Sequence, residues 1–133
     1  MIVVDTNLLV YLLAPSGLTA QAEAVLKRDP LWVTPLLWRS EFRSALVGLM
    51  RHGNLTMDIA REIAHRAESW MSGREYPAST DHVLRLAAAS ACSSYDCEFV
   101  AVAQDLDVPL VTADRQILRA FPKTAVSLDG FLA

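Results

Sequence analysis

The chain has 133 residues, which suits one compact domain and leaves little room for a second. Apolar residues make up 53% of it, slightly more than a lone soluble domain needs, so an apolar face for a second copy or another protein is expected. The formal net charge of −3 argues against a nonspecific nucleic-acid coat protein, because such proteins are basic.

The N-terminal part alternates between strand and helix signals. Ile2–Val4 is a short, uninterrupted β-branched run, which predicts a buried parallel strand. Leucines at helical spacing then predict a helix over residues 8–13, ended by Pro15-Ser16-Gly17. A second helix is expected from Thr19, as its capping residue, to about Arg28, where Asp29-Pro30 stops it.

The next stretch repeats the alternation with longer helices. Trp32–Thr34 predicts a second strand, and Pro35 suits the first turn of a long helix that reaches about His52. Gly53-Asn54 is a turn signal, and a fourth helix is expected from about Thr56 to Met71.

The second half of the chain continues this order. Residues 73–79 are interpreted as a connection with room for a short strand. The elements expected after it are helices over Asp81–Cys92 and Tyr95–Leu106, a buried strand over Pro109–Thr112, a helix over Asp114–Ala120 and a last strand over Ala125–Leu128. Strands that alternate with helices predict an α/β fold with a parallel sheet.

Two acidic residues directly follow predicted strands. Asp5 follows the first strand, and Asp114 follows the strand that ends at Thr112. In open parallel sheets, ligands bind outside the carboxyl ends of the strands, so both carboxylates are expected at the same edge of the sheet.

Glu41 is an acid on the inner side of a long helix. It comes three residues after Trp38 and four before Ala45, so it borders the apolar stripe rather than the solvent face. A structural alternative is a buried salt bridge with Arg39 or Arg43.

Asp96 shares the inner face of its helix with Phe99, Val100 and Ala103, whereas Glu98 is expected on the opposite, solvated side. For Asp5, Asp96 and Asp114 taken singly, helix capping is an equally good explanation. The combination with Glu41 favours a common site, because four converging carboxylates repel one another unless a cation neutralises them. Oxygen ligands without His or Cys favour Mg²⁺, or Mn²⁺, over zinc.

Four segments in order carry a resemblance to a known family: Met1–Leu13 (MIVVDTNLLVYLL), the isolated Glu41, Tyr95–Ala103 (YDCEFVAVA) and Leu110–Arg115 (LVTADR). The chain resembles the PIN domain, and most of all the VapC-type toxins of bacterial toxin–antitoxin pairs. The resemblance covers the whole chain.

The resemblance implies a three-layer α/β/α fold with a small parallel sheet and a metal-dependent endoribonuclease. It also implies a homodimer, an RNA substrate and a cognate antitoxin protein that holds the enzyme inactive. The catalytic, metal-binding acids of the family correspond to Asp5, Glu41, Asp96 and Asp114, and its supporting polar residues correspond to Thr6, Asn7 and Thr112.

The expected chemistry is metal-assisted hydrolysis of a phosphodiester bond. Asp5 and Asp96 are the expected direct ligands of one or two Mg²⁺ ions, while Glu41 and Asp114 bind through water or orient the attacking water. The basic residues near these acids are candidate phosphate contacts, with a solvated basic face as the equal alternative; they are Arg39, Arg43, Arg115 and Arg119.

Two other classes of function are weighed against this one. A receiver-like phosphoacceptor signalling domain also has acids at strand ends, but it needs paired acids after the first strand and a Lys after the last, and here Asp5 stands alone. A noncatalytic RNA-binding module would tolerate loss of the acids and bind no metal.

The two cysteines, Cys92 and Cys97, have neither a zinc nor a thioredoxin spacing and are expected to be reduced thiols. The N-terminus lacks the features of a signal peptide, and no apolar run is long enough to span a membrane. A cytoplasmic protein without membrane association is therefore expected.

Overall fold

The computed structural model describes residues 1–133. Its five strands are β1 (Ile2–Val4), β2 (Trp32–Pro35), β3 (Glu75–Tyr76), β4 (Leu110–Val111) and β5 (Ala125–Val126). Its eight helices are α1 (Thr6–Leu13), α2 (Thr19–Arg28), α3 (Trp38–Arg51), α4 (Met57–Met71), α5 (Thr80–Ala88), α6 (Ser94–Leu106), α7 (Arg115–Ala120) and α8 (Leu128–Leu132). The predicted alternation of strands and helices is confirmed.

All paired strands are parallel, in the spatial order β3-β2-β1-β4-β5. The first strand of the chain is therefore the central one, and Val3 lies between Val33 of β2 and Leu110 of β4. Val3 and Val4 have no exposed surface. A strand covered on both faces needs apolar side chains at every position, which is the pattern that Ile2–Val4 shows.

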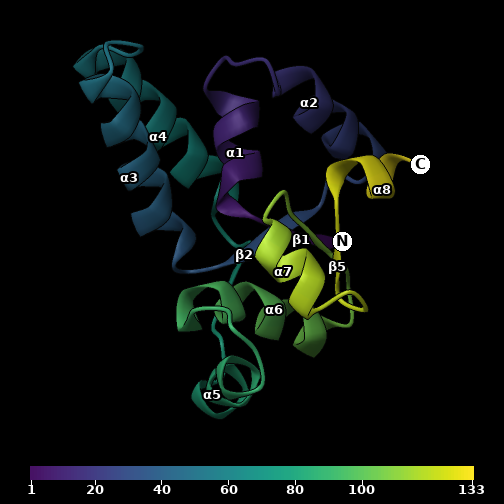
Figure 1. Cartoon of the computed structure of the whole chain (residues 1–133). Helices are drawn as coiled ribbons and strands as arrows, with labels where there is room; N and C mark the ends of the chain where they lie inside the picture. Colours follow the sequence, from purple (N-terminus) through teal and green to yellow (C-terminus); the bar gives the residue numbers. More distant parts are fainter.

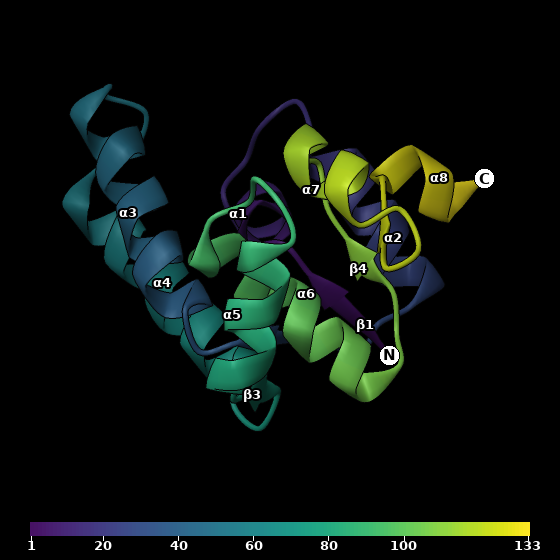
Figure 2. The same ribbon diagram turned by 60° about the horizontal axis from the view of Figure 1, so that its bottom comes forward.

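Helices cover both faces of this sheet, so the fold has the three layers that were expected (Figure 1). Alternate side chains of β1 point to opposite faces: Ile2 and Val4 join the core formed with α1, α2, α3, α4 and α8, whereas Val3 joins the core formed with α5, α6 and α7. Trp32, Trp38 and other large side chains fill the first of these cores. Helices α3 and α4 lie side by side and project from one end of the sheet (Figures 1 and 2).

The predicted helix starts lie within three residues of the observed ones, and two of the differences have a clear structural reason. Pro35 is the last residue of β2, paired with Tyr76, and α3 begins only at Trp38. The fixed φ of proline fits an extended backbone as well as a first helical turn, so the sequence does not separate the two. Leu18, rather than Thr19, is the capping residue of α2; the Thr19 hydroxyl instead donates to the Tyr11 carbonyl at 2.7 Å.

Two predicted ends are also wrong. The helix expected to reach Cys92 ends at Ala88, because the Ser90 hydroxyl donates back to the Leu86 carbonyl at 2.8 Å and also accepts from the Cys92 amide. The last strand is shorter than predicted, since Ser127 caps the unpredicted helix α8 by accepting from the Gly130 amide at 3.0 Å.

The carboxyl ends of the parallel strands lie at one edge of the sheet, and three helices begin there. Helix α1 follows β1 directly, α3 follows β2, and α7 follows β4. Helix α6 packs across β1, β2 and β4, with α5 lying alongside it (Figure 2). None of the helices combines the length and apolarity that a membrane crossing requires.

Candidate active site

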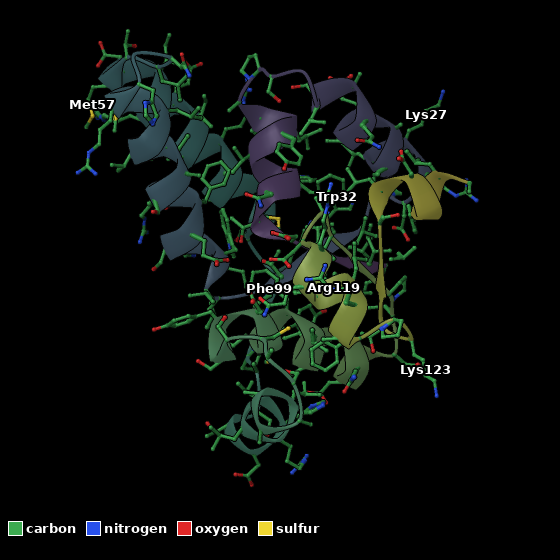
Figure 3. All side chains as sticks on the ribbon, in the orientation of Figure 1. Lys27, Trp32, Met57, Phe99, Arg119 and Lys123 are labelled. Carbon is green, nitrogen blue, oxygen red and sulfur yellow. The ribbon has the colours of Figure 1, made fainter.

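A pocket of about 290 Å³ opens at the carboxyl edge of the sheet. All four acids singled out in the sequence line it, although they come from four different helix starts. Its lining residues are Asp5, Thr6, Asn7, Glu41, Ser44, Asp96, Phe99, Leu110, Thr112, Asp114 and Ile117. Phe99, in α6, lies near the middle of the molecule, whereas Lys27, Lys123 and Met57 lie at its periphery (Figure 3).

Asp5 is fixed from both sides of its carboxylate. Oδ2 accepts a hydrogen bond of 2.5 Å from the Thr112 hydroxyl, and Oδ1 accepts one of 3.0 Å from the Asn7 amide, which makes Asp5 the cap of α1. Its own amide donates to the Val111 carbonyl at 3.1 Å, as a continuation of the β1–β4 ladder. The position of Asp5 is therefore set by the central pair of strands.

Glu41 receives a hydrogen bond from the start of α1. The Thr6 hydroxyl donates to Glu41 Oε1 at 2.8 Å, and Thr6 is itself buried. The alternative of a salt bridge within α3 is wrong, because Arg39 pairs with Glu75 through two hydrogen bonds of 2.7 and 2.9 Å and Arg43 pairs with Glu68 at 3.3 Å. Glu41 thus faces the pocket without a basic partner.

The other two acids lie in the first turns of α6 and α7. Asp114 caps α7, since its Oδ1 accepts from the amides of Gln116 and Ile117 at 2.8 and 3.1 Å. Asp96 is not the cap of α6; Ser93 is, and its hydroxyl accepts from the Asp96 amide at 3.1 Å. Capping thus accounts for one oxygen of Asp114 and for neither oxygen of Asp96.

The electrostatics of the pocket disfavour ionised carboxylates. Burial raises the pKa of Asp5 above its usual value, hydrogen bonds from Thr112 and Asn7 oppose this, and the charges of Asp114 and Asp96 raise the pKa further. Burial likewise raises the pKa of Glu41, against the Thr6 hydrogen bond, with added contributions from Asp5, Asp96 and Glu98. No ion pair of the structure involves any of the four pocket acids.

This donor set fits a hard divalent cation, because carboxylate oxygens are the ligands that Mg²⁺ and Mn²⁺ prefer. As the side chains stand, no three His, Cys, Asp or Glu residues converge closely enough to enclose an ion. Mg²⁺ keeps several of its waters and is usually held by one or two carboxylates, so it does not require such an enclosure.

Some features of the site are not evident from the sequence. Ser44 and Ile117 lie outside the segments that carry the resemblance and are recognised only from the pocket, in which Phe99 and Leu110 form further apolar walls. Glu98, expected to be solvated, is half-buried, and burial raises its pKa. Helical spacing puts Glu98 on the side of α6 away from Asp96, and α5 packs near that side.

The four arginines differ in their surroundings. Arg39 and Arg43 hold carboxylates of β3 and α4, as described above, while Arg115 and Arg119 make no ion pair. Arg119 lies on α7, toward the middle of the molecule in the view of Figure 3. Their contact with phosphate stays a prediction.

Replacing Thr112 with valine tests the support of Asp5. The fully buried Thr112 hydroxyl donates to Asp5 Oδ2 and accepts from the Asp114 amide at 3.0 Å, so Thr112→Val removes the partner of Asp5 Oδ2 and that of the Asp114 amide. We expect the free energy of unfolding to fall by about 1–3 kcal/mol in chemical denaturation. Thr80→Val, at an exposed position, is the matched control and should change it by less than about 0.5 kcal/mol. Equal stability of the two variants would contradict the role of Thr112.

The fold and the pocket together define a parallel α/β domain with an acidic pocket at the carboxyl edge of its sheet. Comparison with known sequence families gives a match to the PIN domain over residues 2–123. The chain belongs to the PIN domain family, a family of nucleases that are typically metal-dependent. This membership excludes the receiver-domain alternative.

Solved structures with a similar fold confirm the architecture. The crystal structure of PAE2754 from Pyrobaculum aerophilum matches with a TM-score of 0.76 and 24% sequence identity, over 98% of this chain and 92% of that one. The crystal structure of FitAcB from Neisseria gonorrhoeae also matches with a TM-score of 0.76, at 16% identity, over 96% of this chain and 98% of that one. Comparison with curated proteins gives no match.

Proposed function

We propose that the protein is a divalent-metal-dependent endoribonuclease that acts as the toxin of a toxin–antitoxin pair. The observation that carries this proposal is the convergence of Asp5, Glu41, Asp96 and Asp114 on one pocket in which no basic side chain neutralises them. Membership of a nuclease family supports the reaction class. The choice of RNA rests on the resemblance of the sequence to VapC-type toxins.

Asp5 and Asp96 are the residues proposed to hold Mg²⁺ or Mn²⁺, which when bound activates water and stabilises charge that develops on the phosphate. The Thr112 hydroxyl and the Asn7 amide fix the orientation of Asp5 by donating hydrogen bonds to its carboxylate. In metal sites, carboxylates that bind the ion are commonly held by such hydrogen bonds. Thr6 fixes Glu41 through Oε1 and leaves Oε2 free to accept a proton from an attacking water.

RNA has to approach an acidic pocket on a protein with a net charge of −3. Arg115 and Arg119 are the better candidates for phosphate contacts, because their guanidinium groups have no carboxylate partner. Arg39 and Arg43 would have to leave Glu75 and Glu68 to bind phosphate, and the two-pronged Arg39–Glu75 pair makes this costly.

The antitoxin partner and a homodimer belong to the same proposal. A groove between α3 and α4 is lined by apolar side chains that include Val47, Met50 and Met57, and Met57 is 62% exposed. Such a surface supports an interface with another chain. We also propose one domain and a cytoplasmic location, consistent with the free cysteines Cys92 and Cys97.

Cleavage of labelled single-stranded RNA and of DNA with the same sequence tests this function. In Mg²⁺ the protein is expected to cut the RNA at internal positions, and to stop when EDTA is added in excess. A variant with Asp96→Asn, purified in parallel, excludes a contaminating ribonuclease. Cleavage that persists in EDTA, or in the Asp96→Asn protein, would contradict the proposal, as would cleavage of DNA alone.

A further inference from the structure

The acidic pocket contains few side chains that can donate a hydrogen bond to a substrate. Its carboxylates only accept hydrogen bonds when they are ionised. Both threonine hydroxyls in its lining, those of Thr6 and Thr112, already donate to carboxylates. The remaining polar side chains of the lining are those of Asn7 and Ser44, and neither side chain forms a hydrogen bond within the protein. A phosphate group in the pocket therefore finds its neutral side-chain donors in these two residues.

Ser44 lies on the face of α3 that presents Glu41 to the pocket. The two residues are three positions apart, so they are neighbours on one side of the helix, with about 5–6 Å between their Cβ atoms. Both line the pocket, and Ser44 is exposed there. The Ser44 hydroxyl thus lies beside the carboxylate that is proposed to accept a proton from the attacking water.

The fold makes no use of the Ser44 hydroxyl. Serines in helices commonly donate back to the carbonyl oxygen four residues earlier. Ser90, directly after α5, forms such a bond with the Leu86 carbonyl at 2.8 Å, whereas Ser44 forms none with Ser40. A substrate can therefore accept a hydrogen bond from Ser44 without breaking a bond of the folded protein.

We propose that Ser44 binds the phosphate that is cut, by donating its hydroxyl hydrogen to a non-bridging phosphate oxygen. The inference rests on the proposed ribonuclease function. Hydrogen bonds to charged oxygens are roughly twice as strong as those between neutral groups, so a single donor matters in a pocket whose other side chains are mainly acids. A nucleophilic serine is not favoured, because such a serine is hydrogen-bonded to its base and Ser44 forms no hydrogen bond with Glu41.

Cleavage of labelled RNA by two variants of Ser44 tests this contact. In Mg²⁺, Ser44→Ala is expected to lower kcat/KM about 10-fold, whereas Ser44→Thr keeps the hydroxyl and should stay within about 3-fold of the wild type. Alanine is the better helix former, so Ser44→Ala should unfold at the same temperature as the wild type or higher. Ser40→Ala, at an exposed position of α3 outside the pocket lining, is the matched control and should keep the wild-type rate.

An RNA with sulfur in place of one non-bridging oxygen at the cleaved phosphate distinguishes a phosphate contact from a structural role. Sulfur accepts hydrogen bonds only weakly. For one of the two phosphorothioate diastereomers, we expect Ser44→Ala to change the rate by less than about 2-fold, while the other diastereomer shows the same loss as the oxygen substrate. An unchanged rate on the oxygen substrate, or an equal loss on all three substrates, overturns the inference and leaves the ribonuclease proposal standing.

Binding of RNA by a protein that does not cut it separates the two proposals. In the Asp5→Asn background, Ser44→Ala should weaken the binding of fluorescently labelled RNA about 5-fold or more in anisotropy titrations with Mg²⁺, and Ser40→Ala should leave it unchanged. RNA binding that depends on Ser44, in a protein whose wild type cuts no RNA, supports the contact and overturns the ribonuclease proposal. RNA cleavage by the wild type, with binding that is equal for the Ser44→Ala and Ser40→Ala proteins, overturns the inference alone.

Discussion

Asp5→Asn is expected to lower the rate of RNA cleavage by a factor on the order of 10³ while the protein stays folded. Asp5 is the pocket acid whose two oxygens are both oriented by the chain, by Thr112 and by the Asn7 amide. An asparagine keeps the shape but removes the negative charge that binds a cation. The measurement is single-turnover cleavage of labelled RNA in Mg²⁺.

Stability distinguishes loss of chemistry from loss of fold in this variant. Asparagine caps helices about as well as aspartate, so α1 should keep its start. Because the pKa of Asp5 is raised in the folded protein, its charge disfavours folding at neutral pH, and Asp5→Asn should unfold at the same temperature as the wild type or higher. Asp58→Asn, in the first turn of α4, is the matched control and should retain full activity. A folded Asp5→Asn protein with more than a tenth of the wild-type rate would contradict the proposed role.

Mg²⁺ or Mn²⁺ is expected to raise the melting temperature of the wild-type protein by roughly 10 °C at a free concentration 100 times its dissociation constant. Such binding stabilises the folded state by about 2.7 kcal/mol, and each kcal/mol shifts the midpoint by about 3–5 °C for a chain of this length. The measurement is differential scanning calorimetry with and without the ion. An unchanged melting temperature at millimolar ion would contradict cation binding by the pocket.

The pH dependence of the stability of the metal-free protein should show that the charges of Asp5 and Glu41 disfavour the folded state. Between their ordinary pKa values and the raised ones, Asp5 and Glu41 hold protons more tightly in the folded state than in the unfolded chain, so their contribution to stability falls as the pH rises. Glu75 acts in the opposite direction, because Arg39 lowers its pKa and its contribution is lost as the pH falls. The stability advantage of Asp5→Asn over the wild type should therefore be largest at pH 7 and shrink toward pH 4.

The position of the acids was predictable because it follows from local rules. A residue directly after a buried parallel strand lies at the carboxyl edge of the sheet, which placed Asp5 and Asp114. Helical spacing placed Glu41 and Asp96 on inward faces, and the pocket brings all four together. Local patterns suffice here because short strands fully covered by helices carry a strong apolar signal.

The partners of these acids were less predictable, since they depend on contacts between distant parts of the chain. Thr6 and Glu41 are 35 residues apart, and Arg39 and Glu75 are 36 apart, in β3, a strand too short to give a pattern. No local sequence signal shows whether Arg39 forms its salt bridge with Glu41 or with Glu75. The same limit explains Glu98, whose surroundings are set by the packing of α5 beside α6.

Isothermal titration of Mn²⁺ into the metal-free protein tests most directly whether the four acids act as one cation pocket. The account predicts saturable binding of at least one ion per chain, competed by Mg²⁺, and strongly weakened in both Asp5→Asn and Asp96→Asn. Absence of binding to the wild-type protein, or binding to either variant that is as strong as binding to the wild type, would contradict it.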